Sequence, residues 1–217
     1  MNWRSKYFWF LTLTVLLYGL FEYYRPKPID WTPSYSNKDK IPFGTKAVFE
    51  LLPDVFGNQR IESLRLPIYN HLSENKTVLK SNYIFVCQAF EIDKNDRNQL
   101  LKYVKRGNNV FISAYDFSDT LLKTLGVRAT LKSPTLRDTA LVMNFVNPIF
   151  KKKGGYVFSE DDGRNYFLIK KAENVTILAQ NARNELIFLK IKYGNGYFFL
   201  HNLPLALTNY YALNSKT

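Results

Sequence analysis

The stretch NYIFVCQAFEIDKNDRNQLLKYVKRGNNVFISAYDF, residues 82–117, decides the fold expected for this chain. Its runs 83–87 and 110–114 are continuously apolar and of strand length, as is typical of strands buried on both faces. Between them, Asp93 is a good helix N-cap, Asp96 takes the acidic position of a capping box, and Gly107 is a suitable stop. Strand, helix, strand units build parallel sheets with right-handed crossovers, so a parallel core is predicted here.

The sequence after this stretch predicts one more helix and then a series of short strands. Asp119 opens the second helix and Gly126 ends it. Turn residues then separate strand candidates, and the Gly194-Asn195-Gly196 turn predicts a hairpin. The candidates are 139–145, 156–159, 166–169, 176–179, 186–192 and 197–200. We therefore expect an α/β domain with a mostly parallel sheet flanked by helices and with antiparallel strands appended late.

The N-terminal segment is apolar and carries no charge from Tyr7 to Phe21. A cleaved signal peptide would end in small residues, and a core helix would alternate with polar positions, but the segment shows neither pattern. Aromatic residues stand at both ends of the run, as at membrane interfaces: Trp3, Trp9, Tyr23, Tyr24 and Trp31. We expect a short tail over residues 1–6 and one uncleaved transmembrane anchor helix over 7–24.

The segment that follows the anchor is rich in proline, which disfavours helix, so residues 25–42 are predicted as an extended tether. The remaining residues, 43–217, are enough for one domain with a sizeable core. Within it, a short helix is expected from Thr45 to Leu52, and Pro53 marks its end or a kink.

The chain carries 30 lysines and arginines against 18 acids, a net charge of +12. These charges are dispersed, and their densest group is Lys151–Lys153. No long basic helix, zinc-ligand spacing or RNA-binding aromatic signature is present, which favours a basic face beside lipid headgroups over a nucleic-acid partner. The single cysteine, Cys87, excludes an internal disulfide. The sequence predicts no cofactor and no metal site.

Three residues are candidates for catalysis because each stands near the carboxyl end of a predicted strand. Cys87 closes the first strand, Asp116 follows the second, and His201 follows the last apolar run. Ligands bind at this edge of parallel sheets, so a nucleophile, a carboxylate and a base could meet there. The alternative is a buried free cysteine, a turn aspartate and a strand-end histidine. Cys87 lies within an apolar run and not on a tight turn, which favours the alternative.

Four residues at the same edge are candidates for binding a ligand. Gln88 follows the first strand, and Tyr115, Asp116 and Phe117 follow the second. Aromatic rings beside one acid suit a ligand cleft, although packing of the core and its rim explains them equally well.

Three longer motifs carry a resemblance to a known family. They are PKPIDWTPSYSNKDKIPFGTKAVFELLPDVF (26–56), LLKYVKRGNNVFISAYDF (100–117) and YGNGYFFLHNLPLALTNYYAL (193–213). Over nearly its whole length the chain resembles domain of unknown function 4350, a family of uncharacterised bacterial membrane proteins.

The resemblance implies a three-layer, flavodoxin-like fold similar to class I glutamine amidotransferases. Catalytic members of that class carry a cysteine on a tight turn after a strand, where this chain has Ala114, Tyr115 and Asp116. His201 is the only catalytic residue that could be carried over, so the expected function is a non-catalytic binding or scaffolding module and not an enzyme. Two alternatives stay open: a hydrolase that uses Asp116 and His201, and an extracytoplasmic ligand sensor.

The resemblance also implies a location and partners. Its members suggest a single-pass protein of the inner, cytoplasmic membrane with an extracytoplasmic domain. The expected partners are the cytoplasmic membrane and envelope or transporter-associated membrane proteins, and not nucleic acid. Members of the family usually continue to a second membrane span, so this chain is expected to be either a fragment or a shortened member of the family.

Overall fold

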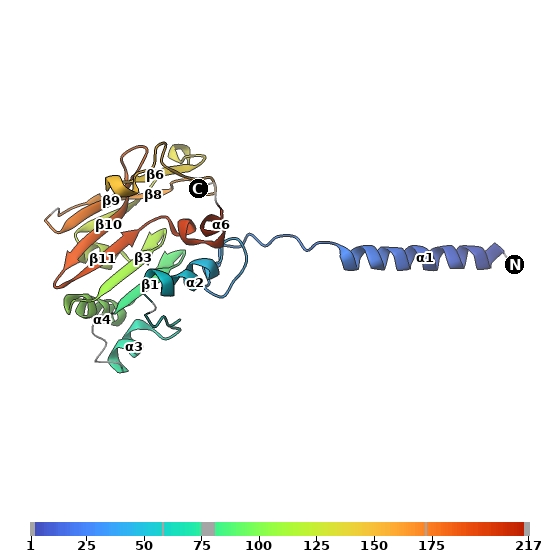
Figure 1. Cartoon of the computed structure of the whole chain (residues 1–217), viewed down its shortest axis with the longest axis horizontal. Coiled ribbons are helices and arrows are strands. Elements are labelled where there is room, and N and C mark those ends of the chain that lie inside the picture. The colour runs from blue at the N-terminus through green and yellow to red at the C-terminus, as the bar shows by residue number, and fades with distance from the viewer. Residues whose placement is uncertain (1–2, 58, 75–80, 172, 215–217) are drawn as a thin grey trace. The chain divides into compact units, whose positions relative to one another are not determined.

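The computed structural model describes residues 3–57, 59–74, 81–171 and 173–214 of the 217-residue chain. The chain divides into two compact units, Met1–Asp30 and Trp31–Thr217. The first unit is built on one helix, α1 (Trp3–Tyr24). The second unit contains all the described strands and the remaining helices (Figure 1).

The predicted transmembrane anchor over residues 7–24 is wrong. No helix among the described residues is both long enough and apolar enough to cross a membrane. The run lacks charge, but Thr12, Thr14 and Tyr18 dilute its apolar character, and both threonine hydroxyls bond to carbonyls one turn earlier at 2.9 Å. The finding overturns the transmembrane helix of the expected fold and also the single-pass location in the inner, cytoplasmic membrane.

The predicted mostly parallel, three-layer fold is also wrong, because the main sheet is mixed. Among the described residues it has nine strands, in the order β1-β3-β11-β10-β9-β6-β7, with β8 joining β10 and β5 pairing with β8 (Figure 1). The strands that lie in parallel are β1 (Asn82–Val86), β3 (Asn109–Ser113) and β11 (Gly196–His201). The antiparallel strands are β5 (Val127–Leu131), β6 (Leu141–Phe145), β7 (Tyr156–Phe158), β8 (Asn165–Ile169), β9 (Val175–Asn181) and β10 (Leu186–Tyr193).

Connection length explains why the late strands are antiparallel. A parallel pair needs a crossover of a dozen residues or more, whereas β10 and β11 are joined by Gly194-Asn195 alone, as the hairpin prediction required. Two very short strands, β2 (Ala89–Phe90) and β4 (Asp116–Phe117), form a separate parallel pair just beyond β1 and β3. The parallel unit is therefore real but forms only part of the sheet.

Helix α4 (Lys94–Lys105) confirms the predicted crossover helix and packs Leu100, Tyr103 and Val104 against the sheet. Asp93 caps it, because its Oδ1 accepts a hydrogen bond from Asp96 N at 2.7 Å. Asp96 does not complete a capping box. Its Oδ1 accepts from Tyr69 N at 2.7 Å, so it binds the first turn of the adjacent helix α3 (Ile68–Glu74).

The remaining helical elements are short. Helix α2 (Lys46–Val55) continues through Pro53, and it lies against α6 (Asn209–Ala212), while α5 (Asp119–Thr124) packs on β5. Three 3-10 turns complete the unit: η1 (Pro134–Leu136), η2 (Pro148–Phe150) and η3 (Pro204–Leu207). The predicted tether over 25–42 includes Tyr35, which is buried in this unit.

Gly196 gives a test of how β11 fits beneath α4. A Cβ at this position would overlap the carbonyl oxygen of Asn108 and would lie 2.6 Å from that of Val104. Backbone atoms cannot yield as a flexible side chain can, so we expect Gly196→Ala to lower the free energy of unfolding by about 3 kcal/mol or more. Urea denaturation followed by circular dichroism measures this. Gly19→Ala is the control, because a Cβ at Gly19 meets nothing within 4 Å; equal stability of the two variants would contradict the packing described.

Candidate functional site

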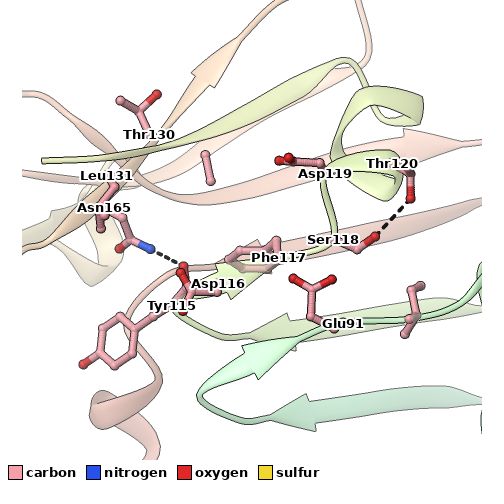
Figure 2. Close-up of a pocket in the computed structure, with 12 residues that line it drawn as sticks. Glu91, Tyr115, Asp116, Phe117, Ser118, Asp119, Thr120, Thr130, Leu131 and Asn165 are labelled. Atoms are coloured by element: carbon pink, nitrogen blue, oxygen red, sulfur yellow. Dashed lines mark hydrogen bonds between the residues drawn. The ribbon is translucent and has the colours of Figure 1, made fainter.

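An open cleft of about 590 Å³ lies beside the β2–β4 pair, where the parallel strands end (Figure 2). One wall comes from the segments that follow β1 and β3, and the other from the antiparallel strands β5 and β8. The residues that line it are Glu91, Ile92, Tyr115, Asp116, Phe117, Ser118, Asp119, Thr120, Ala129, Thr130, Leu131 and Asn165. The carboxyl edge of the parallel strands is the usual place for a ligand in such sheets.

The polar lining of the cleft is acidic. Glu91, Asp116 and Asp119 are exposed, and none of them forms an ion pair with another residue of the described chain. Hydroxyl groups stand beside them, and Ser118 Oγ lies 3.1 Å from Thr120 Oγ1 (Figure 2). An ionised carboxylate only accepts hydrogen bonds, so the cleft offers acceptors to a ligand that carries donors.

Buried amides fix the floor of the cleft. The side chain of Asn165, on β8, donates to the carbonyl oxygen of Tyr115, which follows β3 (Figure 2). Asn202, directly after β11, donates through Nδ2 to the Asn165 carbonyl oxygen at 3.0 Å. These bonds join the parallel part of the sheet to its antiparallel part, so the two walls of the cleft are held at a fixed separation.

Behind the floor lies a buried pair formed by Tyr115 and Asp161. The Tyr115 hydroxyl donates to Asp161 Oδ2, and Gly163 N donates to Asp161 Oδ1 at 2.8 Å. The Arg164 guanidinium lies 4.6 Å from the Tyr115 ring centroid. Burial raises the pKa of Asp161 and also raises the pKa of the Tyr115 hydroxyl. The tyrosine therefore keeps its proton and donates a hydrogen bond to the carboxyl oxygen of Asp161.

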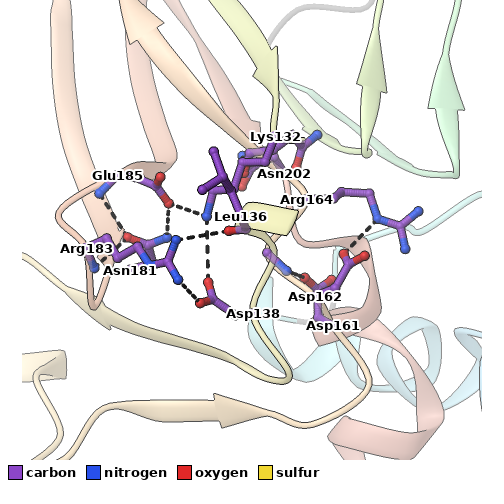
Figure 3. Close-up of polar contacts among 12 residues, drawn as sticks. Lys132, Leu136, Asp138, Asp161, Asp162, Arg164, Asn181, Arg183, Glu185 and Asn202 are labelled. Carbon is purple, nitrogen blue, oxygen red and sulfur yellow. Dashed lines mark hydrogen bonds and ion pairs between the residues drawn. The ribbon is translucent and has the colours of Figure 1, made fainter. Parts of the chain in front are cut away.

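A network of ion pairs supports the loop that carries Asp161 (Figure 3). Lys132 Nζ, which is almost fully buried, lies 2.6 Å from Glu185 Oε2 and 3.6 Å from Asp138 Oδ2. Arg183 and Asp138 pair at 2.6 Å. Lys132 N also donates to the carbonyl oxygen of Arg164 at 2.7 Å, which ties the network to the loop. The acids in this network are all paired with basic side chains, so its role is structural.

The sequence-predicted binding residues are placed as follows. Tyr115, Asp116 and Phe117 line the cleft. Gln88 is not among the lining residues, but its carbonyl oxygen accepts from Tyr115 N at 3.0 Å and from Asp116 N at 3.2 Å. Its side chain accepts from the hydroxyl of Tyr35 at 3.5 Å, and burial is the main cause that raises the pKa of Tyr35 to about 12. Gln88 therefore supports the cleft through the backbone.

The candidate catalytic residues are not brought to one surface. His201 is buried between the rings of Phe111 and Phe188, and its Nδ1 lies 2.8 Å from Ser113 Oγ. It is not among the residues that line the cleft, where Asp116 is exposed. Burial lowers the pKa of His201 to about 4 and raises the pKa of the Cys87 thiol to about 11. At neutral pH the imidazole is uncharged and the thiol keeps its proton.

Sequence reasoning missed most of the cleft. Asp119 was assigned only to a helix start, and the structure makes Ser118 the N-cap with Asp119 as the first helical residue. Glu91 could have been found, because it closely follows a predicted strand end, as Asp116 does. Thr130, Leu131 and Asn165 have no local signal, since they reach the cleft only through the antiparallel pairing of β5 with β8.

His201 predicts a specific pH dependence of stability. Its pKa is lowered from 6.5 to about 4 on folding, so below pH 6.5 the unfolded chain binds a proton that the folded chain does not. The stabilisation is complete above pH 6.5 and is lost as the pH falls toward 4. We expect the contribution of His201 to the free energy of unfolding to fall by about 2 kcal/mol when the pH is lowered from 7 to 5.

Urea denaturation of the wild type and of His201→Gln at both pH values measures this contribution. The pKa of Asp161 is raised, so Asp161 changes the free energy of unfolding in the opposite direction over this pH range. The quantity to compare is therefore the difference in free energy of unfolding between wild type and variant at each pH. His71→Gln, which changes the other histidine of the chain, is the control. A pH dependence that is identical in wild type and His201→Gln would contradict the burial of a neutral imidazole.

The fold can be compared with known structures. The mmIFT52 N-terminal domain matches with a TM-score of 0.51 and 15% identity over 74% of this chain and 80% of that one, a likeness of fold alone. The exo-beta-1,4-mannosidase Op5Man5 from Opitutaceae bacterium strain TAV5 matches with a TM-score of 0.46 and 14% identity, over 82% of this chain and 30% of the mannosidase. A putative GMP synthase protein from Thermoplasma acidophilum matches with a TM-score of 0.48 and 12% identity, over 77% of this chain and 82% of that one.

The matched part of this chain thus spans about 30% of the mannosidase. No curated protein matches the chain significantly. A family model does match, and it covers residues 37–216, which include every strand of the sheet and every residue of the cleft. The chain therefore belongs to the family described as domain of unknown function (DUF4350).

Proposed function

We propose that this domain is a non-catalytic binding module whose ligand occupies the cleft beside β4 and α5. The observation that carries the proposal is the set of three exposed carboxylates, Glu91, Asp116 and Asp119, that line one cleft without basic partners in the described chain. In this proposal the domain holds its ligand for a partner protein and does not transform it, which is the scaffolding role that the family resemblance implied.

The grouping of three acids at one cleft contrasts with the positive charge of the molecule as a whole. The chain has 12 more basic than acidic residues, so basic partners for an acid are abundant. Some acids elsewhere in the domain use them, as Asp138, Asp162 and Glu185 do, whereas exposed acids such as Asp54 and Glu173 form no ion pair in the described chain. A cleft that keeps its carboxylates free provides a local negative potential within a positive molecule. Such a site favours a small ligand that is rich in hydrogen-bond donors and carries a cationic nitrogen.

The chemistry of the buried groups favours binding over hydrolysis. A nucleophile needs a lowered pKa or an adjacent base, and burial instead raises the pKa of Cys87. Ser113 does contact His201, but both side chains are buried and neither lines the cleft. The walls of the cleft are also fixed by the Asn165 and Asn202 hydrogen bonds, which suits a preformed binding site.

Calorimetric titration of the full-length chain with spermidine, a donor-rich polycation, tests the proposal, and glucose serves as a neutral, donor-rich comparison. We expect spermidine to bind the wild type, and we expect the double variant Glu91→Gln, Asp116→Asn to weaken its binding at least tenfold, about 1.4 kcal/mol. These changes keep side-chain size and remove the charge. Binding should also weaken as salt is added, because the partners are exposed charges.

Glu173→Gln is the matched control, since Glu173 is an exposed acid outside the cleft. The proposed site is refuted if the control loses as much affinity as the cleft variant, or if spermidine does not bind. If glucose binds and depends on Glu91 and Asp116 in the same way, the cleft is a binding site but the ligand need not be cationic.

A further inference from the structure

The turn between β6 and β7 exposes a group of large apolar side chains outside the cleft. Ile149 is 84% exposed, Phe150 is 56% exposed and Val146 is 51% exposed. We call these three residues the apolar tip. All three belong to the β6–β7 connection, two of them to η2. Single exposed apolar residues are ordinary, but three of them within one short connection indicate a contact surface.

The backbone of this turn is tied down by specific hydrogen bonds. Asn144 binds the Lys152 backbone twice: its Oδ1 accepts from Lys152 N at 3.0 Å, and its Nδ2 donates to Lys152 O at 2.7 Å. Asn147 Oδ1 accepts from Ile149 N at 3.0 Å, and the Tyr156 hydroxyl donates to Phe150 O at 2.9 Å. The turn is therefore ordered in a conformation that directs Ile149 into solvent, so a partner would meet a preorganised surface.

Basic side chains follow the apolar tip directly. Lys151, Lys152 and Lys153 are all exposed, and none of them forms an ion pair within the described part of the chain. Lys152 Nζ lies 5.4 Å from the ring centroid of Tyr156, which leaves its charge available at the surface. Three flexible ammonium groups thus stand next to three exposed apolar side chains.

We propose that residues 146–153 dock onto an anionic lipid surface, with Ile149 and Phe150 entering the headgroup region and Lys151–Lys153 contacting lipid phosphates. Charge complementarity and shape favour this occupant. A projecting tip suits a deformable surface, whereas a protein partner would need a cleft that matches it. Apolar insertion and electrostatic attraction to anionic lipid act together in such contacts. This is peripheral contact through one turn and not a membrane span, and it is independent of the ligand proposed for the cleft.

A fluorophore placed on the tip tests this proposal in the full-length chain. Because Cys87 is the single cysteine, Cys87→Ser with Ile149→Cys allows labelling at one position with the environment-sensitive dye NBD. We expect blue-shifted and several-fold brighter emission with vesicles that contain phosphatidylcholine and phosphatidylglycerol, and little change with phosphatidylcholine alone. The dye reports on the tip itself, so contacts made by other parts of the chain do not produce the signal.

Two controls match the label and the charge. The same dye at Leu136→Cys, 58% exposed in η1, should not respond. Changing Lys151, Lys152 and Lys153 together to glutamine should abolish the response at position 149, while changing Lys170, Lys171 and Lys192 to glutamine should leave most of it. The proposal is overturned if the dye on the tip gives no response to anionic vesicles, if both dye positions respond alike, or if both triple variants behave alike. A blue shift that grows with protein concentration in the absence of vesicles would also overturn it, because it would identify a second copy of the chain as the occupant.

Discussion

The position of β11 between β3 and β10 is the constraint on which the rest of this domain depends. β11 runs parallel to β3 and antiparallel to β10, so the sheet changes type at this strand. Phe198 and Leu200 are fully buried, and Gly196 passes so close to the backbone of α4 and β3 that no side chain fits there. At its carboxyl end, His201 O accepts from Ala114 N at 3.0 Å, and Asn202 follows with its bond to Asn165. The strand therefore sets the position of the segment that carries Tyr115 and Asp116.

The segment before α2, near the start of the second unit, is held by hydrogen bonds to a residue near the end of that unit. The buried Asn209 side chain accepts from Ala47 N at 2.8 Å and donates to the carbonyl oxygens of Asp39 and Ile41 at 2.9 and 2.8 Å. Within the same segment Tyr35 has a positive φ of 49°, which is uncommon for a residue other than glycine. Its side chain is buried and contacts Gln88 behind the cleft. Asn209, near the end of the second unit, thus fixes the segment before α2, and Tyr35 from that segment supports Gln88. These hydrogen bonds join residues far apart in the sequence, so a short sequence window does not show them.

How far the sequence predicts this molecule depends on how local each signal is. Helix α4 and strands β1 and β3 were predicted correctly, because Asp93, Gly107 and two apolar runs act over a few residues. The type of the sheet was not, because β5 pairs with β8 and β6 pairs with β9, and the partners in each pair are far apart in the sequence. The N-terminal run was misread because freedom from charge was taken as apolar character, although threonines and tyrosines interrupt it. The wall of the cleft that β5 and β8 form was missed for the same reason as the sheet type, since the pairing of Ala129 with Phe167 and of their neighbours brings these strands to the cleft.

Two groups of acids in this domain differ in their surroundings: one group has partners within the domain, and the other is exposed in the cleft. Asp161 is buried, and its carboxyl is satisfied by Tyr115 and Gly163; Asp138 and Glu185 are satisfied by Lys132. Each of these would be costly to leave unpaired, because a buried charge without partners loses its hydration. Glu91, Asp116 and Asp119 remain in water, where leaving them without partners costs little. The feature that supports a ligand site is therefore their grouping at one cleft, and not their lack of partners alone.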